Sequence, residues 1–361
     1  MYASSRVAAC AYCSAHTFAF ALRRGAKPAS LTGYRDLREE VVFTVAEAMA
    51  RVPSDLTTSQ CVALTEHFST EDVEWIVLSI GLMGFLNKFM DALGVELESK
   101  SINEVGALLT LTGWSPGQHA EVDVKIPNES VLPKKDSLGT YFRVLQQVPS
   151  AIRLEQHWTT DVPNQWPEAG VFLEKHTGHS FPILSHLRHK RVIRALTTVL
   201  RDNLDSEQSE VGLTAKCLAG FVYATVVKNK TSEQEARLIA GRLAPSLDET
   251  TFDPISRFAA KPSVEDISSY QQTLLDLSEL PGMSKRDAAA ILLARAASSS
   301  PARIDPKLLR DISPLLTPAS IVELIVWLSV QQLLQRLGSF YAVTKVYEVQ
   351  AECQATPNRT T

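Results

Sequence analysis

The chain has 361 residues, of which 45% are hydrophobic and 21% are charged, with a formal net charge of −4. This composition provides enough apolar residues for one large core or two ordinary ones, and it lacks the basic excess typical of nucleic-acid-binding proteins. The most apolar stretch, residues 75–89, is interrupted by polar residues and is shorter than the ~18 residues that cross a bilayer, so we expect no membrane segment.

In chain order, apolar residues recur at helical spacing through most of the sequence. Residues 111–180 differ, because they are rich in proline and tryptophan and are interpreted as loops with short helices. The only alternating stretch, residues 122–126, is too short to indicate a sheet. The predicted helices cover residues 10–24, 37–52, 57–66, 73–93, 184–200, 211–228, 233–243, 267–280, 285–297 and 320–343.

Local signals mark several of these helix ends. Pro53 ends the helix over 37–52, since proline cannot continue a helix. A capping box at residues 69–72 precedes the helix over 73–93, and Gly94 stops that helix.

The first helix carries the residues that indicate chemistry, Cys10, Cys13 and His16, on adjoining turns. A thiolate is a nucleophile, a helix N-terminus lowers its pKa, and a second thiol can convert the oxidised product into a disulfide. We therefore expect any reaction to take place here. Two other interpretations stay open: these residues could bind zinc together with a distant ligand, or the cysteines could be ordinary core residues.

Other motifs point to no further site. A group of histidines at residues 176–189 lacks the carboxylates of known zinc motifs and is interpreted as a basic helix surface. Nucleotide-binding glycine loops and the serine-hydrolase motif do not occur in the sequence. We therefore predict no metal and no bound cofactor.

The second half of the chain repeats part of the first. The segment from Pro53 corresponds to the segment from Pro301, and the thiol helix corresponds to a later helix in which Cys217 matches Cys13. In this pairing the second copy keeps one thiol but lacks the other thiol and the imidazole.

We predict an all-α fold of two tandem, related helical modules, of which the second is degenerate. The first module covers residues 1–110, and a Pro- and Trp-rich connecting segment covers 111–180. The second module covers residues 181–345, and a polar tail covers 346–361. The thiol helix begins so close to Met1 that we expect the N-terminus of the first module to be truncated.

The composition also bears on the compartment. Five scattered cysteines are too few for a disulfide scaffold, which indicates a reducing compartment and a cytoplasmic location. The first 35 residues hold five basic and no acidic residues, which is typical of a mitochondrial transit peptide. A mitochondrial location is therefore the alternative.

The Cys-x-Tyr-Cys-Ser-Ala-His-Thr motif at residues 10–17, with residues 64–97, resembles the alkylhydroperoxidase D-like (AhpD-like) and carboxymuconolactone decarboxylase superfamily. This resemblance implies an all-helical, usually oligomeric protein. It also implies that Cys13 attacks a peroxide, that Cys10 resolves the product, and that His16 belongs to a proton relay. The glutamate of that relay would fall at or before Met1.

The function expected from the resemblance is thiol-dependent peroxide reduction by a peroxiredoxin-like oxidoreductase. The expected partners are a small hydroperoxide substrate, an external dithiol reductant and further copies of the chain in a homo-oligomer. One alternative is a catalytically impaired or non-enzymatic helical scaffold of the same superfamily. A further alternative is a carboxymuconolactone decarboxylase-like lyase.

Overall fold

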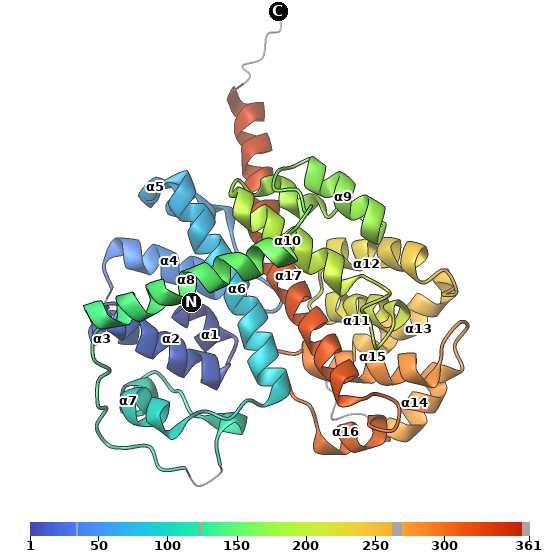
Figure 1. Cartoon of the computed structure of the whole chain (residues 1–361), viewed down its shortest axis with the longest axis horizontal. Helices are drawn as coiled ribbons and strands as arrows, with labels where there is room; N and C mark the ends of the chain where they lie inside the picture. Colours follow the sequence, from blue (N-terminus) through green and yellow to red (C-terminus); the bar gives the residue numbers. More distant parts are fainter. Residues whose placement is uncertain (34, 122–123, 262–268, 356–361) are drawn as a thin grey trace, which may run out of the picture.

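The computed structural model describes residues 1–33, 35–121, 124–261 and 269–355, the last eleven as backbone only (Figure 1). These residues form the α-helices α1 to α17 and two 3₁₀ helices, and they contain no strand, which confirms the all-α prediction. Within the alternating stretch, residues 122–123 lie outside the described part of the chain and 124–126 form no strand.

The helices before residue 160 are α1 (Tyr2–Val7), α2 (Ala11–Arg23), α3 (Pro28–Thr32), α4 (Leu37–Ala50), α5 (Thr58–His67), α6 (Thr70–Leu93), α7 (Ser99–Thr110), η1 (Gly117–His119) and α8 (Leu138–Trp158). The later ones are α9 (Glu168–Thr177), η2 (Pro182–His186), α10 (Lys190–Asn203), α11 (Leu213–Val226), α12 (Lys230–Leu243), α13 (Glu249–Ala259), α14 (Tyr270–Ser278), α15 (Lys285–Ser298), α16 (Pro306–Ile312) and α17 (Pro318–Ala355).

Helices α6 and α17 lie side by side at the centre of the molecule, with the earlier helices on one side and α9 to α16 on the other (Figure 1). Glycines allow the two backbones to approach closely. A Cβ atom at Gly84 would lie 2.8 Å from Cδ of Arg336, and one at Gly81 would lie 3.0 Å from Cδ2 of Leu337. A larger side chain at either position would therefore separate the central pair.

Helix α6 is, among the described residues, the one helix that is long and apolar enough by length and composition to cross a membrane. Two of its buried charged groups, however, have partners within the protein. The Glu74 carboxylate accepts hydrogen bonds from the backbone amides of Arg188 and His189 at 2.9 and 3.2 Å. The Lys88 ammonium donates to the carbonyl of Ala297 at 2.7 Å. Helix α6 thus has the contacts of a core helix.

Several helices differ from the prediction. Helices α7 and α13 lie outside the predicted ranges, and α10 begins at Lys190 instead of residue 184; α8 and α17 differ as well. Helix α8 is a continuous helix of 21 residues inside the segment interpreted as loops with short helices. The prolines of the segment concealed the helical spacing of Leu138, Tyr141 and Leu145, and Pro149 lies within the helix. Helix α17 continues past residue 343 to Ala355, so part of the expected polar tail is helical.

Two helix–loop–helix units share one backbone geometry. Between α1 and α2, Ala9 has a φ of 55°, and between α11 and α12, Lys228 has a φ of 56°. The next residue caps the second helix in each unit: Cys10 Sγ accepts from the amide of Cys13, and Asn229 Oδ1 accepts from the amide of Ser232. This geometry matches Cys10 with Asn229, whereas the sequence comparison matched Cys13 with Cys217.

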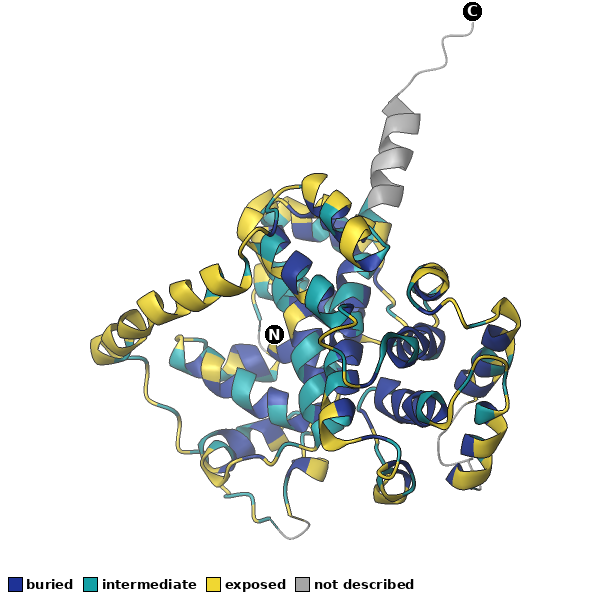
Figure 2. Ribbon diagram, turned by 45° about the vertical axis from the view of Figure 1, so that its right-hand side comes forward, coloured by how far each residue is buried: buried dark blue, intermediate teal, exposed yellow. Residues whose placement is uncertain are grey.

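Helix α8 stands apart from the core and has no buried residue, which Figure 2 shows as an exposed helix extending from the body. Large apolar side chains are exposed along it, including Phe142 at 65%. In contrast, Phe18 of α2 is fully buried and packs edge-on against Tyr2 with ring centroids 5.1 Å apart. The apolar side chains of α2 therefore belong to a packed cluster, whereas those of α8 do not.

A pair of phenylalanine substitutions tests this contrast. Phe18→Ala should lower the free energy of unfolding by about 3–5 kcal/mol, because it leaves a cavity in a packed cluster. Phe142→Ala should change it by less than about 0.5 kcal/mol, because its ring is largely exposed. Urea denaturation followed by circular dichroism measures both values. Equal losses would show that α8 contributes to the core.

Candidate functional site

The thiol pair lies at the N-terminus of α2. Cys10 is the N-cap residue, and its Sγ accepts a hydrogen bond from the backbone amide of Cys13 at 3.3 Å. Both side chains are buried, with residue exposures of 0% and 4%, and both are free thiols. The partial positive charge of a helix N-terminus stabilises a thiolate at this position. The predicted helix and thiol pair are therefore present, with Cys10 at the N-cap position directly before the first helical residue, Ala11.

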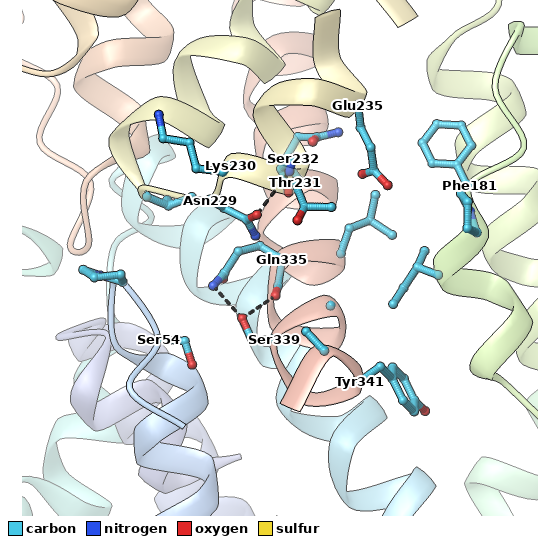
Figure 3. A pocket seen from close by; sticks show the side chains of 18 of the residues that line it. Ser54, Phe181, Asn229, Lys230, Thr231, Ser232, Glu235, Gln335, Ser339 and Tyr341 are labelled. Atoms are coloured by element: carbon cyan, nitrogen blue, oxygen red, sulfur yellow. Dashed lines mark hydrogen bonds between the residues drawn. The ribbon is translucent and has the colours of Figure 1, made fainter. Parts of the chain in front are cut away.

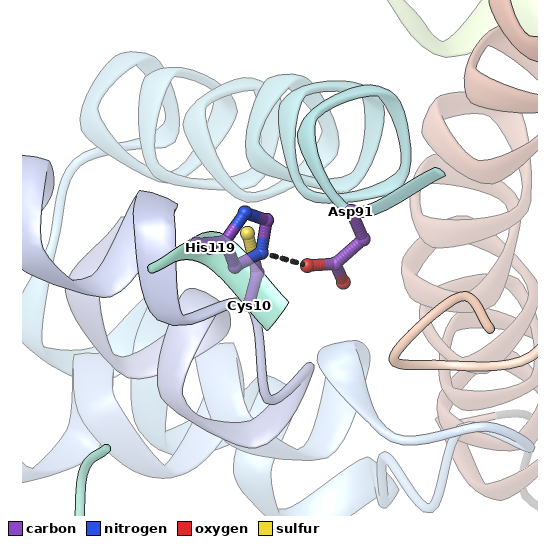
Figure 4. A group of neighbouring side chains, drawn as sticks. All are labelled: Cys10, Asp91 and His119. Carbon is purple, nitrogen blue, oxygen red and sulfur yellow. Dashed lines mark hydrogen bonds and ion pairs between the residues drawn. The ribbon is translucent and has the colours of Figure 1, made fainter. Parts of the chain in front are cut away.

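An imidazole and a carboxylate from distant parts of the chain complete the cluster. Asp91 comes from the last turn of α6, and His119 comes from η1. Cys10 Sγ, a carboxylate oxygen of Asp91 and a ring nitrogen of His119 all lie within 4.8 Å of one another. Figure 4 shows the three side chains and the elements that carry them. All three side chains are buried.

The chain between α6 and η1 holds His119 in place. The carbonyl of His119 accepts from the amide of Leu97 at 2.7 Å, and the neighbouring Gln118 amide donates to the carbonyls of Asp91 and Ala302 at 3.1 and 3.3 Å. Further along, the Trp114 indole donates to the carbonyl of Ala11 at 3.0 Å. Side-chain contacts to the ends of α6 and α2 thus position a segment that has little regular structure.

Both ring nitrogens of His119 face acceptors. Nε2 lies 2.9 Å from Oδ1 of Asp91, and Nδ1 lies 2.7 Å from the carbonyl of Val95. Only the doubly protonated ring can donate to both. Burial by itself lowers the pKa of His119, but hydrogen bonds to Asp91, Cys10 and Val95 outweigh it and raise the pKa to about 10. The site therefore contains an imidazolium at neutral pH.

The thiol of Cys10 retains its proton. Its hydrogen bond with Cys13 and then its burial raise its pKa well above the ordinary value, while His119 opposes this shift. Cys10 is therefore protonated at neutral pH. It can give its proton to a neighbouring oxyanion, after which its thiolate would face the imidazolium of His119.

A second buried cation lies within electrostatic range of the pair. The Arg336 guanidinium of α17 donates to Oγ of Ser4 at 2.6 Å and to the carbonyl of Ile80 at 3.1 Å. Its Nη2 has no hydrogen-bond partner among the described residues. Burial lowers the pKa of Arg336 to about 10, and electrostatic interaction with Cys13 and Cys10 opposes that shift. Arg336 therefore favours a thiolate in this pair.

His16 lies apart from the cluster, at the surface. Its Nε2 is 2.9 Å from the Glu98 carboxylate, and its ring packs against that of Tyr12 at an interplanar angle of 41° with centroids 4.4 Å apart. The structure thus brings Cys10 and Cys13 together and directs His16 elsewhere. His119 is the imidazole beside the thiols.

Zinc binding, the alternative interpretation of the motif, fits this arrangement poorly. Cys10, Asp91 and His119 could offer three ligand atoms. A metal needs an unprotonated ring nitrogen, however, and both nitrogens of His119 already donate to oxygen acceptors.

The remaining buried cysteines have ordinary core surroundings. Burial raises the pKa of Cys61 to about 11 and that of Cys217 to about 12. Neither lies beside an imidazole in the described part of the chain, so neither shares the properties of the α2 pair.

Sequence reasoning missed Asp91 and His119, although one local signal pointed to Asp91. A carboxylate in the last turn of a helix lies near the negative end of the helix dipole. Such a residue needs a cation, and His119 supplies it. No family model, curated protein or solved structure was found to match this chain.

The protonated state of His119 predicts a pH-dependent stability. Its pKa rises from 6.5 to about 10 on folding, so its contribution is complete below pH 6.5 and is lost as the pH rises through 10. The difference in the free energy of unfolding between the natural chain and His119→Gln should be about 3 kcal/mol at pH 6 and should shrink toward pH 10. Urea denaturation at pH 6, 8 and 10 measures it.

Burial lowers the pKa of Lys88 to about 7, so Lys88 makes stability depend on pH in the opposite direction to His119. Lys88 is present in both proteins, so its effect cancels when their free energies of unfolding are subtracted. His16→Gln, at the exposed histidine, should show a much smaller difference from the natural chain at each pH. A constant difference for His119→Gln would contradict the assignment of an imidazolium.

Proposed function

We propose that this chain is a thiol-dependent hydroperoxide reductase in which Cys13 is the nucleophile, Cys10 resolves the product and His119 with Asp91 forms the proton relay. The observation that supports this proposal is a buried thiol pair at a helix N-terminus, in contact with an imidazolium. The roles of Cys13 and Cys10 follow the AhpD-like resemblance, whereas His119 replaces the role expected of His16.

In the first step, the Cys13 thiolate attacks the terminal oxygen of the hydroperoxide. An S–O bond forms, the O–O bond breaks, and the sulfur becomes a sulfenic acid. The alkoxide that leaves takes the proton of the Cys10 thiol and departs as an alcohol. The Cys10 thiolate that remains is stabilised by the imidazolium of His119.

In the second step, the Cys10 thiolate attacks the sulfur of the Cys13 sulfenic acid. A disulfide forms and hydroxide leaves, and the proton of His119 converts it to water. Asp91 keeps the ring oriented throughout, and the ring then regains a proton from solvent. An external dithiol reduces the disulfide by exchange and becomes a disulfide itself. These steps need no metal or organic cofactor.

A non-enzymatic helical scaffold is the second candidate, and the burial of both thiols favours it. A peroxide must reach Cys13, whose residue exposure is 4%. In the scaffold proposal the thiols, His119 and Asp91 form a polar group that joins α2, α6 and η1, and oxidants would not reach them.

Consumption of tert-butyl hydroperoxide with dithiothreitol distinguishes the two proposals. The natural chain should consume the peroxide, and Cys13→Ser should reduce the rate to that of buffer because the nucleophile is lost. His119→Gln should lower the rate about 100-fold, as expected for loss of general acid–base catalysis.

Two variants serve as controls. Cys61→Ser removes a buried thiol outside the site and should leave the rate unchanged. His16→Gln should change the rate by less than about twofold, because the residue lies at the surface. If the natural chain and Cys13→Ser consume peroxide equally slowly, the reductase proposal fails and the scaffold proposal stands.

A further inference from the structure

A cavity of about 510 Å³ lies between the N-terminus of α12, helix α17 and η2 (Figure 3). Asn229 and Ser232 line this cavity. In the capped loop between α11 and α12 they take the positions that Cys10 and Cys13 take between α1 and α2. The cavity therefore lies where the second half of the chain corresponds to the thiol site. The first site is closed by buried side chains, whereas this one is open. A small molecule of moderate size would fit within this volume.

The floor of the cavity is polar, and no cysteine lines it. Asn229 and Ser232 contribute an amide and a hydroxyl from α12. Gln335 and Ser339 contribute the same groups from α17, and the Gln335 amide donates to Oγ of Ser339 at 3.1 Å. These neutral groups can hydrogen-bond a ligand hydroxyl, but they cannot perform the thiol chemistry of the first site.

A carboxylate and two aromatic rings line one side of the same cavity. Glu235 points into the space, with the rings of Phe181 and Tyr341 on the same side of the view (Figure 3). Burial raises the pKa of Glu235. No ion pair or hydrogen bond is formed by its carboxylate within the described part of the chain. A carboxylate beside aromatic faces attracts a cation.

The neighbouring features agree with a cationic ligand. Lys230 also lines the cavity, but its side chain extends away from Glu235 (Figure 3) and pairs with Glu233 at 2.9 Å, so it does not neutralise Glu235. Phe181 is held at a φ of 53°, a left-handed conformation that is uncommon for a non-glycine residue and clusters at ligand sites.

We propose that this cavity binds a small organic ammonium ion. Glu235 pairs with its charge, Phe181 and Tyr341 contact the carbon atoms around the nitrogen, and the amide and hydroxyl floor binds a polar group at the other end. This site is separate from the thiol pair and does not depend on the proposed reductase activity.

Isothermal titration calorimetry of the full chain with two matched probes tests the proposal. Choline carries a quaternary ammonium and a hydroxyl, and 3,3-dimethyl-1-butanol has the same shape without the charge. Choline should bind at least ~10-fold more tightly than its neutral counterpart. Benzyltrimethylammonium, which adds an aromatic ring, should also bind in the same cavity and compete with choline.

Glu235→Gln should remove the preference, so that choline and 3,3-dimethyl-1-butanol bind within ~3-fold of each other. Glu279→Gln, a substitution at an exposed residue that does not line the cavity, should leave the preference for choline unchanged. Thermal unfolding of both variants checks that they fold. Absence of saturable binding by both ammonium probes, equal binding of the charged and neutral probes, or preferential binding of acetate through Lys228 and the α12 N-terminus would each overturn the proposal.

Discussion

Two cations, Lys88 on α6 and Arg336 on α17, are buried where the central helices pack together, and an uncompensated charge in such a place would be very costly. Lys88 donates to the carbonyls of Ala297, Ser298 and Ser299, at the C-terminal end of α15, where the helix dipole is negative. Each cation thus donates hydrogen bonds to the opposite half of the chain, since Arg336 donates to Ser4 and Ile80 of the first half. The relative position of the halves follows from this exchange.

The buried charge of Arg336 also affects the thiol site. Arg336 reaches Ser4 of α1, directly ahead of the loop that carries Cys10, and its positive charge acts on both thiols. His119 adds a second positive group, with Asp91 as its counter-charge. The cluster therefore combines a structural role, joining α1, α2, α6 and α17, with conditions that favour a reactive thiolate.

Capping residues and helix-stopping glycines in the sequence correctly predicted helix ends. Ser69 caps α6 and Gly94 ends it with a φ of 58°, both as expected from the sequence. Helix α8 was missed because prolines obscured its periodicity and no buried face marks it. The division into two related modules stays a prediction, although the capped loops at Cys10 and Asn229 share one geometry.

In the candidate site, too, the sequence predicted the local part and missed the part that depends on tertiary contacts. Cys10 and Cys13 lie on one helix, so their spacing alone predicted their proximity. His119 joins them only through the tertiary contacts of η1, which no local pattern contains. His16 shares a face of α2 with Tyr12, four residues earlier, and that face lies near the surface.

The central claim is that Cys10 and Cys13 act as one redox pair. One equivalent of tert-butyl hydroperoxide added to the reduced natural chain, followed by alkylation and peptide mass spectrometry, tests it directly. We expect an intramolecular disulfide between Cys10 and Cys13, with Cys61 and Cys217 recovered as alkylated thiols. Recovery of all four cysteines as free thiols, or oxidation confined to another cysteine, would contradict the claim.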